Sequence, residues 1–355
     1  MKHASRLESA QRAPERARPS AGRARRRIAR WTIVGVAVLF VSVLIGLFAG
    51  AIRIPPLGIL GWMVGDGSLT EQQRAILAQL RLPRVVLAGL VGAALSVSGC
   101  AYQAAFRNPL ADPYLLGSAA GAGLGATMVI VLGLTDAPFA LPAAAFVGAL
   151  GGVGLAYLIA STRAAGRTST SLLLAGVAVA SFLTALQTYV QQRDTDDLRA
   201  VYAFILGRLG TGGWHEVLLA LPWVLLASAV LLASRRLLEV LSLGDLEAAS
   251  LGAHVARDRA IVVIAASLAT AAAVAVAGLI GFVGLIVPHA VRMATGASHR
   301  QVVGLSLLFG ASFLILCDVL ARTVVAPGEL PIGVITAMIG APFFAIVLRR
   351  AGGAR

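Results

Sequence analysis

The stretch AIVVIAASLATAAAVAVAGLI, which covers residues 260–280, decides the fold class of this chain. It contains no charged residue and matches the roughly 20 apolar residues that an α-helix needs to cross the hydrocarbon core of a bilayer. Further apolar runs cover approximately residues 31–52, 85–106, 113–134, 138–160, 171–192, 214–233, 282–297, 302–324 and 333–348. The sequence therefore predicts an all-α, polytopic membrane protein with about ten transmembrane helices.

The overall composition supports this class. Of the 355 residues, 58% are hydrophobic and 13% are charged, whereas soluble domains carry about 45–50% apolar and about 25% charged residues. The apolar runs and their connections use nearly the whole chain. We therefore expect a basic, disordered cytoplasmic tail at residues 1–30 and a transmembrane domain at residues 31–350, with no soluble catalytic domain.

The net charge of +14 is distributed as in a membrane protein rather than a nucleic-acid-binding one. Arginines gather in the N-terminal tail and in short segments between apolar runs, as cytoplasmic loops do. The C-terminus is also basic, through Arg349, Arg350 and Arg355. Two cytoplasmic ends require an even number of spans, and ten is even. Some arginines would then face outward, and these exceptions are Arg81, Arg84, Arg193 and Arg199.

Glycine spacing predicts close helix packing in two neighbouring runs. Gly117, Gly121 and Gly125 repeat every four residues, and Gly148 and Gly152 do the same in the next run. Small residues at this spacing let helices approach closely in lipid. A shorter apolar piece at residues 201–209 cannot span the bilayer, so we expect an interfacial or re-entrant helix there.

The residue types needed for catalysis are missing. A phosphate-binding loop requires a Gly-Lys pair, and the only lysine of the chain is Lys2, so a separate polypeptide must hydrolyse any ATP that the protein uses. The two cysteines, Cys100 and Cys317, lie in different apolar runs, which indicates packing residues rather than a disulfide or metal site. We expect no metal, no cofactor and no enzymatic activity.

A transporter driven by an ion gradient is the main alternative. Such carriers usually need an intramembrane carboxylate that changes protonation. Asp318 lies within an apolar run but four residues before Arg322, so the two can pair on one helix face. A membrane enzyme is a second alternative, but the sequence shows no nucleophile, metal cluster or paired carboxylates for one. A purely structural membrane scaffold is a third, and the ordered motifs described next argue against it.

Five segments together resemble the FecCD-type permeases, the membrane subunits of ATP-binding-cassette importers for iron-siderophores, haem and vitamin B12. The segments are RLPR at 81–84, FRNPLADP at 106–113, LLLAGV at 172–177, GFVGLIVPH at 281–289 and ELPIGV at 329–334. They occur in the family's order and spacing, and the resemblance extends from about residue 31 to 350. The last third is most similar to the vitamin B12 permeases of the family.

The resemblance implies a type II ABC importer permease fold and several partners. These are two ABC ATPase subunits on the cytoplasmic side, a periplasmic or lipid-anchored substrate-binding protein, and a second permease subunit, in a homodimer or close heterodimer, with the translocation path at its interface. The implied location is the cell membrane. The implied cargo is an iron chelate (siderophore or haem) or cobalamin, and the sequence does not distinguish among them.

The resemblance also gives a role to outward-facing arginines. In the family, exposed basic residues receive acidic residues of the binding protein, and the matching positions here are Arg81, Arg84 and Arg322. A guanidinium can grip a carboxylate through two parallel hydrogen bonds, which suits such a contact. The alternative is that these arginines anchor helix ends or, for Arg322, only pair with Asp318.

The long inward connection at residues 234–259 is the candidate ATPase contact, since the family places its coupling helices here. Residues 245–251 can form a short amphipathic helix that is capped by Asp245 and ended by Gly252. An ordinary solvated loop is the alternative. The predicted coupling residues are Gly244, Asp245, Leu246, Glu247, Ala248, Leu251 and Gly252.

Overall fold

The computed structural model describes residues 21–50, 52, 54–65, 69–137, 139–161, 169–193, 198–209, 213–296, 298–326 and 328–352, and every regular element among them is a helix. The elements are α2 (Ala21–Phe48), α3 (Pro56–Met63), α4 (Glu71–Ala75), the π-helix η1 (Ile76–Arg81), α5 (Leu82–Ala105), the 3₁₀ helix η2 (Pro113–Leu116), α6 (Ser118–Val131), α7 (Ala140–Ala160), α8 (Ser169–Arg193), α9 (Leu198–Ile205), α10 (Trp214–Ala233), α11 (Arg235–Leu243), α12 (Asp245–Ser250), α13 (Val255–Ala277), α14 (Val283–Thr295), α15 (His299–Thr323) and α16 (Ile332–Gly352). The predicted all-α class is confirmed.

The transmembrane prediction agrees with these elements. Among the described residues, seven helices are long and apolar enough to cross a membrane, and the shorter helices α6, α14 and α16 are also apolar. Each of the ten predicted runs coincides with one of these helices. The agreement is expected because a lipid-facing helix must hold its apolar residues in one continuous segment.

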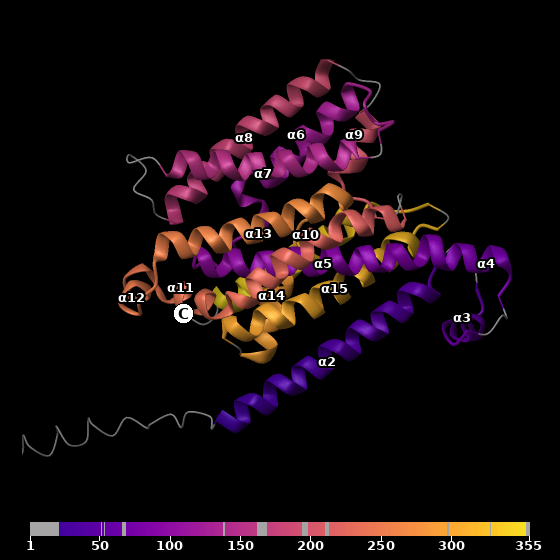
Figure 1. Cartoon of the computed structure of the whole chain (residues 1–355), viewed down its shortest axis with the longest axis horizontal. Coiled ribbons are helices and arrows are strands. Elements are labelled where there is room, and N and C mark those ends of the chain that lie inside the picture. Colours follow the sequence, from indigo (N-terminus) through magenta and orange to yellow (C-terminus); the bar gives the residue numbers. More distant parts are fainter. Residues whose placement is uncertain are drawn as a thin grey trace, which may run out of the picture.

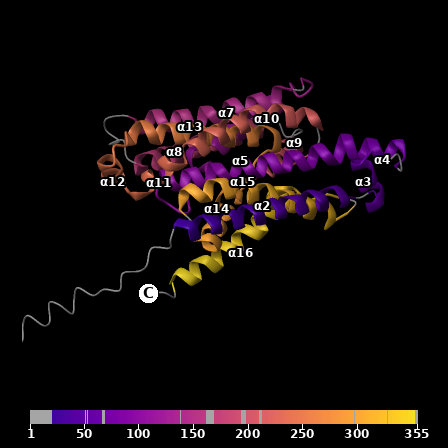
Figure 2. The same ribbon diagram turned by 60° about the horizontal axis from the view of Figure 1, so that its bottom comes forward.

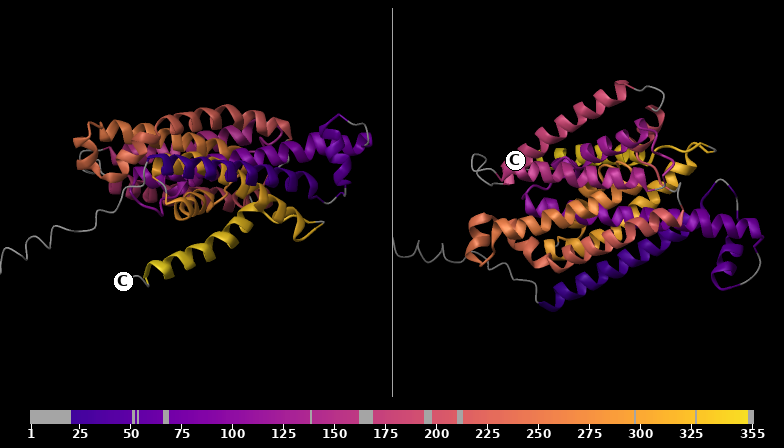
Figure 3. Two further views of the ribbon diagram at one scale, coloured as in Figure 1. Left: turned by 90° about the horizontal axis from the view of Figure 1, so that it is seen from below. Right: turned by 45° about the horizontal axis from the view of Figure 1, so that its top comes forward.

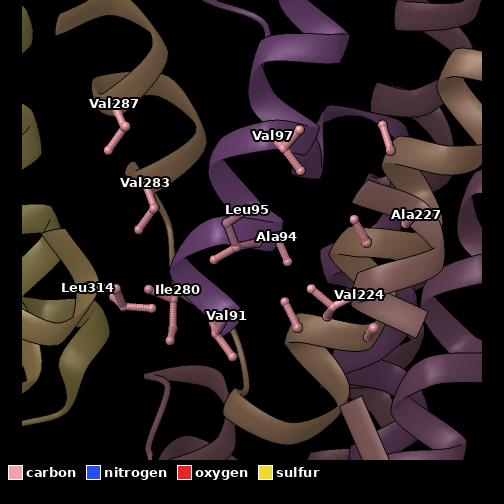
Figure 4. Packing of buried hydrophobic residues seen from close by; sticks show 14 of the residues in the cluster. Val91, Ala94, Leu95, Val97, Val224, Ala227, Ile280, Val283, Val287 and Leu314 are labelled. Carbon is pink, nitrogen blue, oxygen red and sulfur yellow. The ribbon is translucent and has the colours of Figure 1, made fainter. Parts of the chain in front are cut away.

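The centre of the bundle is formed by α5, α13 and α15, most of whose residues are buried (Figure 1). Val91 and Leu95 of α5 pack near Ile280, before α14, and Leu314 of α15 (Figure 4). The helices α6, α7 and α8 form a layer along one side of this centre, and α2 lies along the other (Figures 1 and 2). The helix α16 contacts α14 and α15 and leans away from the bundle (Figure 3).

The predicted close approach of glycine-bearing helices is confirmed for α6 and α7. A Cβ atom added at Gly121 would overlap the backbone carbonyl of Gly148, and one at Gly148 would overlap the carbonyl of Gly121. Gly152 stands in the same relation to the carbonyl of Gly117. The two backbones therefore touch, which only glycine permits at these positions.

The N-terminal prediction needs a correction. Residues 1–20 lie outside the described part of the chain, but α2 already begins at Ala21, so the expected disordered tail is wrong for residues 21–30. Alanine and arginine are both strong helix formers, and the segment AGRARRRIAR continues directly into the first apolar run. The predicted short helix at 201–209 is present as α9.

The helices give the molecule two distinct ends. One end carries α3 and α4, and it is called the α3 end below (Figure 1). The other end carries α11 and α12, the start of α2 and the end of α16, and it is called the α12 end (Figures 1 and 2). The predicted docking arginines lie toward the α3 end and the predicted coupling residues lie at the α12 end.

Candidate functional site

A cluster of arginines and carboxylates lies toward the α3 end. Arg84 of α5 donates from Nε to Asp318 of α15 at 2.9 Å, and from Nη1 and Nη2 to the two oxygens of Glu329, each at 2.9 Å. The contact with Glu329 is the two-pronged geometry in which guanidinium–carboxylate pairs are strongest. Asp318 is 2% exposed, Arg84 is 15% exposed and Glu329 is 53% exposed. The cluster thus extends from the interior to the surface.

The expected pairing of Asp318 with Arg322 is confirmed. Nε of Arg322 lies 3.3 Å from Oδ2 of Asp318, one helical turn earlier on α15. Arg322 is itself buried, and its Nη2 donates to the backbone carbonyl of Gly46 in α2. Asp318 therefore has an arginine on each side, which compensates a buried carboxylate and leaves no free intramembrane acid at this position.

Arg81 is buried and binds backbone carbonyls at the end of α2. It is the last residue of the π-helix η1, and its side chain is buried. Its guanidinium donates to the carbonyls of Leu47 at 2.9 Å and Phe48 at 3.4 Å, and also to that of Ile52. These carbonyls belong to the end of α2 and the residues that follow it, where helical partners run out. Arg81 therefore anchors a helix end, the alternative that the sequence left open for it.

The segment between α10 and α13 carries two short helices at the α12 end. Asp245, the first residue of α12, accepts a hydrogen bond from Nη2 of Arg259 at 2.6 Å and lies 3.6 Å from Nη2 of Arg107. Arg259 is buried near the start of α13, and its Nε donates to the carbonyl of Ala105, the last residue of α5. One arginine thus ties α12 to the ends of two central helices.

The capping prediction for α12 is half right. Asp245 does not cap the helix, because Gly244 holds the N-cap position with φ 138° and no side chain caps the first turn. The carboxylate binds Arg259 instead, which offers a charge-assisted partner. At the other end Gly252 has φ 85°, its N–H donates to Ala249, and the N–H of Ala253 donates to Ala248. This is the glycine-terminated Schellman arrangement, so the predicted stop at Gly252 is confirmed.

Apolar side chains project from α12 into open space. Leu246 is 85% exposed and Leu251 is 64% exposed, while Glu247 is also exposed and Ala248 is buried. Large apolar side chains grouped at the surface often mark a contact with another protein. The predicted coupling residues are therefore brought together on one small projection.

Hydrogen bonds join two connecting segments, one before α6 and one before α14. Asp112 caps η2 by accepting from the N–H of Tyr114 at 2.8 Å. The hydroxyl of Tyr114 donates to the carbonyl of Ile280 and accepts from its N–H, at 3.1 and 2.9 Å. The residue after FRNPLADP is thereby joined to the residue before GFVGLIVPH.

A metal centre has no support in the described part of the chain, where no group of three or more His, Cys, Asp or Glu side chains could hold an ion. Cys100 and Cys317 are buried free thiols. Glu329, Arg107 and Arg259 were not predicted as site residues. Glu329 could have been found from its place in ELPIGV, whereas the partners of the two arginines depend on the folded chain.

Comparison with known proteins identifies the family of this chain. Residues 38–350 match the FecCD transport family. The chain belongs to that family. It is 40% identical over 327 residues to an uncharacterized ABC transporter permease, YvrB, of Bacillus subtilis, which covers 90% of this chain and 93% of the relative. It is 41% identical over 316 residues to the cobalamin import permease BtuC of Halobacterium salinarum, covering 89% and 85%.

The fold of this FecCD-family chain also has a solved counterpart. A metal-chelate type ABC transporter in an inward-facing conformation superposes with a TM-score of 0.80 at 30% identity, covering 90% of this chain and 98% of that one. The chain is therefore a multi-pass membrane permease of the ABC importer class and not itself an enzyme. Membership in this family also removes the support for the ion-gradient, membrane-enzyme and scaffold alternatives.

Proposed function

We propose that this permease carries a bulky metal chelate, either cobalamin or an iron chelate such as a siderophore or haem, with energy from separate ABC ATPase subunits. The proposal is supported by FecCD membership and by the printed cargoes of its relatives. The observation that carries it is the presence of two candidate contact surfaces at opposite ends of one bundle. One is the arginine–carboxylate cluster and the other is the leucine-bearing projection of α12.

The ATPase contact is assigned to α12 and its neighbours. Leu246 and Leu251 supply apolar surface that an ATPase cleft would bury, and the Asp245–Arg259 contact fixes the projection to α13 and the end of α5. A movement of the ATPase would then be passed to the central helices rather than dissipated in a loop. This assignment includes the flanking residues Gly244, Glu247, Ala248 and Gly252.

The binding protein is assigned to the α3 end. Arg84 is the most accessible of the three predicted arginines, and its partner Glu329 is half exposed, so an incoming carboxylate could replace Glu329 on the guanidinium. Arg322 and Arg81 would support this contact from below by holding Asp318 and the end of α2. Rim charges of this kind set the encounter rate and the register of two proteins.

The orientation follows from the charges at the α12 end. The arginines exposed there include Arg235, Arg236, Arg257, Arg300 and Arg349, and a basic excess marks the cytoplasmic side. Both termini are therefore assigned to the cytoplasm. The α3 end then faces outward, where a periplasmic or lipid-anchored binding protein would deliver its cargo.

A second permease subunit is assigned to the side that α8 and α16 leave uncovered. Phe182 and Met338 are among the most exposed large apolar side chains of these two helices. The helix α16 contacts only α14 and α15 to any extent among the described elements, so much of its surface lacks a partner within the chain. A homodimer or close heterodimer would cover it.

The deciding experiment is uptake by the permease reconstituted with its ATPase and binding protein in proteoliposomes. The panel of labelled cargoes contains cobalamin, haem and several iron-siderophores. We expect uptake of one class, dependent on ATP and on the binding protein. Uptake that persists without ATP and follows an ion gradient would contradict the ABC assignment, and ATP-dependent uptake of an unrelated solute would contradict the cargo.

A further inference from the structure

A polar cavity opens at the α12 end, between α2, α11 and α15. Its volume is about 640 Å³, and two arginines line it, Arg235 from α11 and Arg300 from α15. Thr32, Ser298 and Gln301 add hydroxyl and amide groups. Ile28, Leu305 and Leu308 form the apolar part of the wall. The cavity is separate from both surfaces assigned above.

The two arginines have no charged partner in the described part of the chain. Neither guanidinium lies within ion-pair distance of a described carboxylate, unlike Arg84, Arg107, Arg259 and Arg322. Glu239 is the one acidic residue on the cavity wall. The lining is therefore net positive, and the exposed Arg236 nearby adds to the same field.

The start of α15 adds a second observation. Ser298 holds its N-cap position without a side-chain capping bond, and the first turn contains no acidic residue and includes Arg300. A cation in the first turn is unfavourable beside the positive end of the helix dipole, whereas an anion there is stabilised by both the dipole and the free N–H groups. An anion between Arg300 and Arg235 would offset the repulsion between Arg300 and the positive end of the α15 dipole.

We propose that the cavity binds the phosphate of an anionic phospholipid from the membrane leaflet at the α12 end. A lipid fits better than a free anion because apolar residues form part of the cavity wall, and α2, whose Ile28 and Thr32 line the cavity, also exposes the large apolar side chains of Ile33, Val36 and Phe40. These side chains can contact the acyl chains while Arg235 and Arg300 hold the phosphate. Basic pockets between helices near this boundary are suited to such headgroups.

Native mass spectrometry of the purified permease can test the site. The protein is titrated with phosphatidylglycerol and, separately, with phosphatidylcholine of the same chain length. The test variant carries Arg235→Gln and Arg300→Gln, and the matched control carries Arg257→Gln and Arg349→Gln, which remove the same charge from exposed positions outside the cavity. We expect the test variant to bind phosphatidylglycerol about tenfold more weakly and the control to keep its affinity. Equal losses in the two variants would overturn the proposal.

A gain of binding provides evidence that misfolding cannot imitate. Glu239→Gln removes the cavity's acidic residue and should tighten binding of phosphatidylglycerol while leaving that of phosphatidylcholine unchanged. Unchanged affinity in this variant would count against the cavity as the site. The last measurement is competition with inorganic phosphate. If phosphate displaces phosphatidylglycerol at equal concentration, the occupant is a free anion and the lipid proposal fails.

Discussion

Removal of the Asp245–Arg259 contact should uncouple ATP hydrolysis from transport. The change is Arg259→Gln, which deletes the 2.6 Å bond from Nη2 to Asp245 and the 3.2 Å bond from Nε to the carbonyl of Ala105. The projection of α12 then loses its shortest side-chain contact with α13 and the end of α5, because the amide of glutamine offers neither partner a charged donor. Of the ion pairs that Asp245 makes in the described part of the chain, only the approach of Arg107 at 3.6 Å remains.

The size of the effect follows from the burial of the two partners. The side chain of Arg259 is 8% exposed and that of Asp245 is 42% exposed. A hydrogen bond to a charged group contributes about 1.5–3 kcal/mol, and the exposure of Asp245 reduces the contribution of this ion pair toward about 1–2 kcal/mol. A loss of that size shifts the equilibrium of α12 from its bound toward its released position by about 5- to 30-fold.

The assay measures cargo molecules imported per ATP hydrolysed by the reconstituted complex. We expect Arg259→Gln to lower this ratio while ATP hydrolysis continues, and Asp245→Asn to lower it similarly. The double variant should cost little more than either single one, because both remove the same contact. An unchanged ratio in Arg259→Gln, or fully additive losses in the double variant, would refute the reasoning.

Three further predictions follow from contacts described above. Gly148→Ala should destabilise the permease by about 2 kcal/mol or more in thermal unfolding, because the added Cβ meets a backbone carbonyl of α6. The control Gly151→Ala, one turn away, places its Cβ where nothing lies within 4 Å, so it should be neutral or slightly stabilising. Equal effects of the two variants would contradict the packing. Arg84→Gln should weaken capture of the binding protein about tenfold in a surface-binding assay, with unchanged affinity as the contrary result, provided that thermal unfolding shows a folded variant. Replacement of both Leu246 and Leu251 by Glu should prevent co-purification with the ATPase, and normal complex formation would show that the contact lies elsewhere.

The sequence predicted the helices well because the information is local. A span such as 260–280 is defined by its own apolar residues, and the bilayer leaves a helix as its natural structure. The stop at Gly252 is likewise local, since it depends on one residue with a positive φ.

The sequence predicted the partners of charged residues poorly because those partners are distant along the chain. Arg81 binds carbonyls near Leu47 and Phe48, more than 30 positions earlier, and no pattern around RLPR indicates them. Asp245 is of a residue type that favours a cap, but it is the first helical residue of α12, after the N-cap Gly244, and its carboxylate binds Arg259 near the start of α13. The π-helix η1 has no sequence signature of its own and was likewise missed.

The helix that begins at Glu71 and continues through η1 and α5 to Ala105 spans 35 residues without a break. At about 1.5 Å per residue, the part from Arg84 to Ala105 measures about 32 Å, close to the hydrocarbon thickness of a bilayer. Arg84 near one end binds the surface carboxylate Glu329, and the carbonyl of Ala105 at the other end binds Arg259. A tilt of about 5° in such a rod displaces one end relative to the other by about 3 Å. Because α5 is one unbroken helix over this length, we expect a displacement at either of its ends to move the other end as well, without any change in secondary structure.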